Sequence, residues 1–174
     1  MLLDFFNTVA NLKNIPRQGW IDKLGLERPE SVSDHTFSMA VISLVFSDIQ
    51  KLDTLRVLKM SLIHDLVESI TGDLTPNHIT KTEKAKLEQT TMKKILQDLP
   101  EDLRNPFSEI WQEFVDKRTP ESILVHEVDK LEMALQAKIY EKNGNYGIQS
   151  FLQSAENEIK NPQLKELFSK IINQ

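Results

Sequence analysis

Hydrophobic residues recur every three to four positions through most of the chain, which is the spacing of one face of an α-helix. Capping residues and prolines mark where such runs begin, because Ser, Thr, Asp and Asn side chains accept hydrogen bonds from the first-turn amides. The runs predict helices that begin at residue 2, after Ser31 or Ser33, at Asp53, after residue 80, after Pro100, at Thr119 and at Asn161. No convincing strand and no internal repeat is present, so the sequence predicts an all-α fold.

Several of these helices have predicted ends as well as starts. The first ends near Pro16, and residues 15–32 are expected to form a long connection. The helix that begins at Asp53 is expected to continue to Gly72, and the one that begins at Thr119 to Gly144, because glycine is common immediately after a helix. A loop over 72–80 then leads into a Lys- and Glu-rich helix, whose residues 81–94 are interpreted as a solvated face.

Two polar residues, His64 and Asp65, interrupt the apolar run LIHDLVESI over 62–70. Burying an imidazole or a carboxylate without a partner costs about 2 kcal/mol or more per group. At about 100° per residue, these two residues share one helix face with Ser61 and Glu68. A metal ion would satisfy this polar stripe, so the pattern indicates a metal site.

Composition narrows the class of protein. The chain has 174 residues with 40% hydrophobic and 27% charged residues, which favours one globular domain spanning 1–174. Its net charge of −5 argues against a partner that is a nucleic acid polymer, and the lack of cysteine excludes disulfides and thiolate zinc sites. Since no signal peptide or membrane span is evident, we expect a cytoplasmic protein with no membrane partner.

Two further residues complete a candidate metal centre. His35 lies in the first turn of the helix after Ser31, and Asp129 lies on the helix that begins at Thr119. With His64 and Asp65 they form a set of two imidazoles and two carboxylates. Such ligands suit one divalent ion, which could be Co, Mn, Zn, Ni, Fe or Mg. Four protein ligands would leave open positions for water and a substrate oxygen.

The order of these residues, a His, then His-Asp, then a distant Asp, resembles the HD-domain phosphohydrolase superfamily and, within it, the 5′-deoxynucleotidase family. The resemblance extends over about three quarters of the chain, in the segments PRQGW (16–20), ERPESVSDHTFSMA (27–40), HDLVESITGDLTP (64–76) and HEVDKLEM (126–133). It implies a helical domain that binds a divalent metal and hydrolyses deoxyribonucleoside 5′-monophosphates. It also suggests a homodimer.

The resemblance further implies roles for individual residues. His35, His64, Asp65 and Asp129 match the metal ligands. Glu68 matches the catalytic acid that orients or deprotonates the attacking water, and no obvious residue protonates the leaving group except Asp73 or a water.

On the substrate side, Arg17 resembles the residue that holds the phosphate, and Trp20 resembles the aromatic that packs on the deoxyribose. Gln18-Gly19 separates these two residues here, whereas the best-described bacterial members place them adjacently. Asp73, Leu74, Thr75 and Pro76 resemble the loop that contacts sugar and base.

Alternative interpretations exist at each level. Trp20 could be a lid over the core, Asp73 a simple turn residue, and His126 either a competing ligand or, as we interpret it, peripheral. The substrate could be a nucleoside triphosphate, a cyclic nucleotide or another phosphomonoester. A non-enzymatic nucleotide-binding protein with the same fold is the rival from a different functional class.

Overall fold

A computed structural model describes all residues, 1–174, and contains helices but no sheet. The predicted all-α fold is therefore confirmed. The helices are α1 (Leu2–Asn11), η1 (a 3₁₀ turn, Leu12–Asn14), α2 (Gln18–Leu24), α3 (Val32–Gln50), α4 (Thr54–Ile63), α5 (Glu68–Thr71), α6 (Lys81–Leu96), α7 (Glu101–Asp116), α8 (Pro120–Lys142), α9 (Gln149–Glu158) and α10 (Pro162–Ile172).

The capping residues chosen from the sequence do begin helices. Ser31 accepts a hydrogen bond from the amide of Asp34, and the Asp34 side chain reaches back to the amide of Ser31. Asp53 accepts from the amide of Arg56, and Thr119 caps α8 with Pro120 at its first position. These caps satisfy amides that have no partner inside the helix, which fixes where each helix starts.

Two helices were not predicted. The expected connection over 15–32 contains α2, and α9 lies in a part of the chain for which no separate helix was expected. Glycine and proline at 19, 25 and 29 favoured a loop in the first case. In the structure Gly25 ends α2 with a left-handed backbone (φ 66°), a conformation that glycine adopts readily, while Gly19 lies inside the helix.

The helix expected from Asp53 to Gly72 is also interrupted. It divides into α4 and the short α5, with His64–Val67 in turns between them. The Ser61 carbonyl accepts a hydrogen bond from Nδ1 of the His64 ring at 2.8 Å, and the following amides bond three residues back rather than four, as from Leu66 to Ile63. A side chain that competes for a backbone carbonyl disturbs the regular helix, and here it tightens the chain around His64 and Asp65.

Three groups of buried side chains hold the helices together. The largest joins α3, α4, α8, α9 and α10, a second joins α1, α3, α6 and α7, and a third packs α2 against α8 and α9. Ile110 packs against the first two groups, and Met133 against the first and third. Because these side chains connect the groups, we infer that the chain forms one domain.

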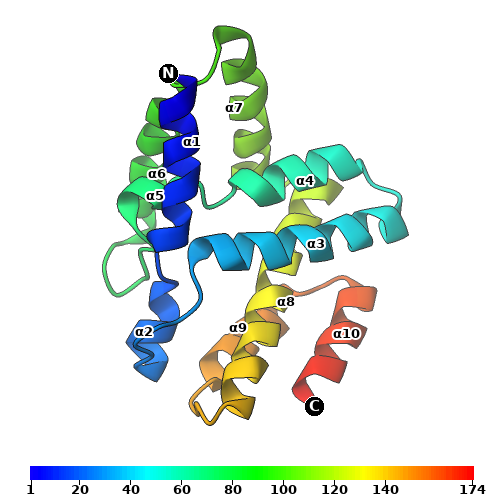
Figure 1. Cartoon of the computed structure of the whole chain (residues 1–174). Helices are drawn as coiled ribbons and strands as arrows, with labels where there is room; N and C mark the ends of the chain where they lie inside the picture. The colour runs from blue at the N-terminus through cyan, green and yellow to red at the C-terminus, as the bar shows by residue number, and fades with distance from the viewer.

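The long helix α8 crosses α3 and α4, with α1, α5, α6 and α7 on one side of this crossing and α2, α9 and α10 on the other (Figure 1). The crossing brings together segments that are far apart in the sequence. None of the helices combines the length and the apolar character that crossing a bilayer requires.

Candidate metal centre

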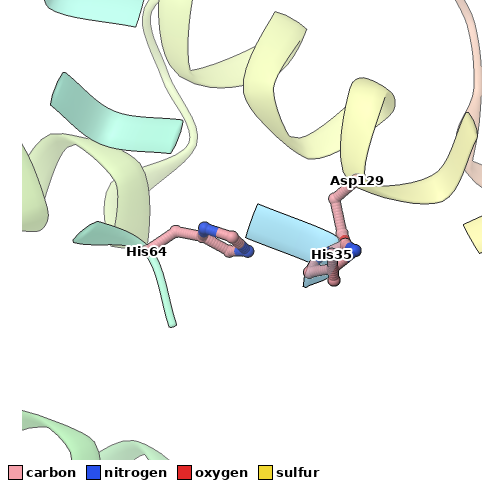
Figure 2. Close-up of side chains that lie close together, drawn as sticks. All are labelled: His35, His64 and Asp129. Atoms are coloured by element: carbon pink, nitrogen blue, oxygen red, sulfur yellow. The ribbon is translucent and has the colours of Figure 1, made fainter. Parts of the chain in front are cut away.

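Three elements each contribute one side chain to a compact polar cluster. His35 comes from the first turn of α3, His64 from the turn after α4, and Asp129 from α8. One donor atom from each residue lies within 4.8 Å of the others. Figure 2 shows the His64 ring directed toward His35 and Asp129. The two histidines are almost fully buried, with 0% and 5% of their surfaces exposed.

Hydrogen bonds fix the orientation of both imidazoles. Nδ1 of His35 lies 2.6 Å from Oε2 of the buried Glu132, and Nδ1 of His64 lies 2.8 Å from the Ser61 carbonyl. Each Nδ1 therefore carries the proton that it donates. Neither Nε2 atom makes a hydrogen bond of normal geometry, although both are buried and each lies close to an aspartate carboxylate. Two buried ring nitrogens that face carboxylates without a normal hydrogen bond are an arrangement that a metal ion would satisfy.

Two carboxylates complete the cluster. Oδ2 of Asp65 lies 3.0 Å from Nε2 of His64 and 3.8 Å from Nε2 of His35, and Oδ1 of Asp129 lies 3.3 Å from Nε2 of His35. The cluster thus brings all four predicted ligands together. Two imidazole nitrogens and two carboxylate oxygens fit a borderline-hard divalent cation, so the residues present suit the expected ion.

Charges within the cluster keep both carboxylates ionised. Burial acts to raise the pKa of Asp65, but His64, when its ring carries the extra proton that a bound cation would replace, and then Arg17 outweigh burial and lower the pKa. Burial opposes ionisation of Asp129 in the same way, and the Lys130 ammonium is the main influence that holds its pKa well below the usual range. A metal site needs deprotonated carboxylates, and this electrostatic environment supplies them.

A pocket of about 260 Å³ opens beside the cluster. Its residues include Asp65 and Asp129 from the cluster, together with the two further acids Glu68 and Asp73. A larger groove of about 490 Å³ lies between α6 and α7, but none of the clustered residues lines it. Of these two cavities, the smaller one is therefore the one that could bring a substrate to the candidate metal centre.

The predicted phosphate residue Arg17 lines this pocket just before α2. Its NH1 donates to Oδ2 of Asp65 at 3.2 Å, and its side chain is only 16% exposed. Burial opposes the charged form, but Asp65 and then Asp73 outweigh it and raise the pKa of Arg17, so the guanidinium is always charged.

The predicted catalytic acid, Glu68, begins α5 at the pocket. It is 3% exposed, and its Oε2 has no hydrogen-bond partner. Burial, and then the neighbouring charges of Asp65 and Asp73, raise its pKa well above the ordinary value. A carboxylate with a raised pKa is a stronger base when it is ionised, which suits proton transfer near neutral pH.

Trp20 lies mostly behind the pocket wall. It is 2% exposed, its ring packs against Phe151 and Tyr140 at centroid distances of 4.1 and 5.2 Å, and its Nε1 donates to Glu30 at 2.9 Å. Part of the residue still lines the pocket, next to Gly19. Trp20 therefore combines the predicted place at the pocket with the core role that was its alternative interpretation.

The 73–76 loop forms another part of the wall, and side chains attach it to its surroundings. Oδ2 of Asp73 accepts from the amide of Gln18 at 2.8 Å, which joins the loop to the start of α2. Thr75 donates to Asp22 at 2.8 Å, and Leu74 and Pro76 complete the lining.

Comparison with known proteins establishes the family. Residues 9–171 match the sequence profile described as the HD domain. The chain belongs to the HD domain family. Proteins named 5′-deoxynucleotidase HDDC2 from mouse and from human are each 39% identical to it, over 98% of this chain and 86% and 84% of their own lengths. Among solved structures, the PH0347 protein from Pyrococcus horikoshii OT3 superposes with a TM-score of 0.83 at 30% identity, covering 97% of both chains.

Sequence reasoning missed several residues of this HD domain site, among them Lys130, which lines the pocket and pairs with Asp129. Glu132 holds the His35 ring and lies three residues after Asp129 on α8, so its helical spacing from a predicted ligand was the available signal. Lys84 was assigned to a solvated face, yet it lines the pocket and lies 3.9 Å from Oε1 of Glu68.

His126, which was interpreted as peripheral, lies outside the cluster. Its Nε2 lies 2.8 Å from the carbonyl of Phe114, and its ring stacks on the Phe114 ring at 4.2 Å. No donor atom of His126 belongs to the cluster formed by His35, His64 and Asp129.

Proposed function

We propose that this protein is a metal-dependent 5′-deoxynucleotidase that converts deoxyribonucleoside 5′-monophosphates to deoxynucleosides and phosphate. The observation that carries the proposal is the pair of unpartnered Nε2 atoms beside two ionised carboxylates, next to a pocket that also holds Arg17 and Glu68. The mouse and human relatives align with 98% of this chain, and their name, 5′-deoxynucleotidase, supports the same activity.

His35, His64, Asp65 and Asp129 are the residues that would hold the divalent cation. When bound, such an ion polarises a phosphoryl group and lowers the pKa of coordinated water. The protein contributes rigidity, because Glu132 and the Ser61 carbonyl each hold the Nδ1 of one imidazole, so that Nε2 is the ring nitrogen left to bind the cation.

Two side chains perform the remaining chemistry that the geometry supports. Arg17 neutralises charge on the non-bridging oxygens of the phosphate, and its contact with Asp65 places the guanidinium beside the ligand set. Glu68 accepts a proton from the attacking water, a role favoured by its raised pKa and by its Oε2, which no protein group engages.

The sugar and base lie against the other wall of the pocket in this proposal. Trp20 and the 73–76 loop form that wall, and Asp73 holds the loop against the start of α2, next to Arg17. A ribonucleotide would press its added hydroxyl against the small part of Trp20 that lines the pocket, where the hydroxyl loses hydrogen bonds to water without replacement. Selection for deoxyribose can arise from this exclusion.

The test is phosphate release from dAMP and from AMP by purified protein supplied with Co²⁺ or Mn²⁺. We expect much faster release from dAMP, and loss of release when the metal is chelated. Equal rates on both substrates would contradict the sugar selectivity. Pyrophosphate or tripolyphosphate release from a triphosphate, with no activity on monophosphates, would assign the site to a different hydrolase reaction.

We also propose that the active form is a homodimer that uses the outer face of α3. Large apolar side chains on this face recur at helical spacing and are 38–71% exposed: Phe37, Val41, Leu44, Val45 and Ile49. An apolar stripe of this kind can pack against its own copy about a two-fold axis. The mass of the purified protein in solution, compared with that of a Val45→Asp variant, tests this. A monomeric wild-type protein would refute it.

A further inference from the structure

Three cationic side chains line the pocket, and two of them form close ion pairs with carboxylates. NH1 of Arg17 lies 3.2 Å from Oδ2 of Asp65. Nζ of Lys130 lies 3.0 Å from Oδ2 of Asp129. Both acids belong to the candidate metal centre, so each of these cations already neutralises part of the charge of one candidate ligand.

The third cation, Lys84 on α6, makes no hydrogen bond to a carboxylate. Its Nζ donates one hydrogen bond, at 2.9 Å, to the neutral backbone carbonyl of Leu74. Its nearest carboxylate oxygens, on Glu88 and Glu68, are 3.7 and 3.9 Å away, which is beyond hydrogen-bond distance. An ammonium group has three donors, so two donors of Lys84 have no protein partner at normal distance.

The position of Lys84 suits an anion in the pocket. Its side chain is 33% exposed and lines the pocket, while its bond to the Leu74 carbonyl holds the ammonium next to the 73–76 loop. A phosphate monoester carries up to two negative charges near neutral pH, and charge-assisted hydrogen bonds to phosphate are the stronger kind.

We propose that Lys84 binds a non-bridging oxygen of the substrate phosphate and, through Leu74, couples the phosphate to the position of the 73–76 loop. The proposal rests on the proposed function for the identity of the substrate. Lys84 and Arg17 then hold the phosphate from two sides, so each positions the phosphorus relative to Glu68.

Variants at this residue separate a phosphate contact from a purely structural role. Lys84→Met removes the charge and the donors at similar size, Lys84→Arg keeps the charge, and Lys84→Gln is a second uncharged variant should the first fail to fold. The matched control is Lys86→Met, because Lys86 is on the same helix but faces the groove between α6 and α7. Each protein is loaded with Mn²⁺ and its metal content is measured first.

Two ligands are then titrated into each loaded protein: inorganic phosphate, and deoxyadenosine, which lacks a phosphate. We expect Lys84→Met to bind phosphate at least about tenfold more weakly and to bind deoxyadenosine within about twofold of wild type, with Lys84→Arg recovering most of the phosphate affinity and Lys86→Met unchanged. The KM for dAMP should rise more than kcat falls.

Unchanged phosphate affinity in Lys84→Met, or in Lys84→Gln, would overturn the proposal. So would an equal loss of affinity for phosphate and deoxyadenosine, since that result means a structural role in the loop, and so would a loaded wild-type protein that binds no phosphate. The failure of the proposed function is a separate result. Wild-type protein that binds phosphate but hydrolyses no deoxynucleotide would refute the activity. The phosphate affinities of the Lys84 variants would still decide whether Lys84 binds phosphate.

Discussion

Glu132 offers a direct test of how the protein holds its metal. This carboxylate accepts from Nδ1 of His35 at 2.6 Å, and both side chains are at most 3% exposed. A hydrogen bond to a charged group contributes about 1.5–3 kcal/mol. Since about 1.4 kcal/mol corresponds to a tenfold change in affinity, loss of this bond should weaken metal binding by about 10- to 100-fold.

Two substitutions separate the contribution of the Glu132 charge to metal affinity from that of its hydrogen-bond acceptor. Glu132→Gln keeps an oxygen acceptor but removes the charge, so we expect about a tenfold loss of affinity for Mn²⁺, at the lower end of the range. Glu132→Ala also leaves the Nδ1–H of His35 buried without a partner, so we expect about a hundredfold loss and lower stability. Competition with a chromophoric chelator at fixed pH measures the affinity, and thermal unfolding of the metal-free proteins measures the stability.

Glu127 provides the matched control. It is a buried acid on the same helix, 4% exposed, but its Oε2 accepts from the amide of Asn161, next to α10. Glu127→Gln should therefore lower stability without changing metal affinity. The reasoning is refuted if folded Glu132→Gln binds Mn²⁺ within twofold of wild type, or if Glu127→Gln weakens metal binding equally.

Three other predictions concern the acid, the metal and the region behind the pocket. Glu68→Gln should reduce turnover by about 10²- to 10⁴-fold with metal content unchanged, and a fully active variant would exclude proton transfer by this residue. Chelation should lower the melting temperature by about 5–10 °C, because metal at a hundred times its Kd adds about 2.7 kcal/mol to stability; superimposable melting curves would contradict a bound ion. Burial, and then the Glu132 carboxylate, raise the pKa of Glu30 from 4.5 to about 7. Between these values the folded metal-free protein keeps a proton that the unfolded chain releases, so stability should fall as pH rises through this window, and Glu30→Gln should reduce that fall in urea unfolding at pH 5 and pH 8. Equal pH dependence in both proteins would count against this effect.

Most helix starts could be predicted because capping is local. Ser31, Asp53 and Thr119 each accept from an amide three residues on, so a short stretch of sequence contains the whole interaction. The interruption after α4 could not be predicted in this way, because it depends on the His64 ring taking the Ser61 carbonyl. A helical period alone does not indicate that competition.

The candidate site likewise contains residues that a sequence pattern reveals and residues that only contacts between distant segments reveal. The order of His35, His64, Asp65 and Asp129 was visible as a family pattern, and the fold places the four together. Glu132 and Lys84 depend on contacts between distant segments, 97 residues apart for Glu132 and His35. A lysine among other lysines on a polar helix has no local feature that marks it as part of a pocket.

The separation of the ligands along the chain has a consequence for synthesis. Residues 35, 64 and 65 leave the ribosome well before residue 129, so a nascent chain that ends before α8 has only part of the ligand set. Domains complete their long-range contacts late in folding. The growing polypeptide should therefore gain tight metal retention only after α8 has emerged and docked, and ribosome-bound fragments that stop short of residue 120 should remain inactive toward cellular nucleotides.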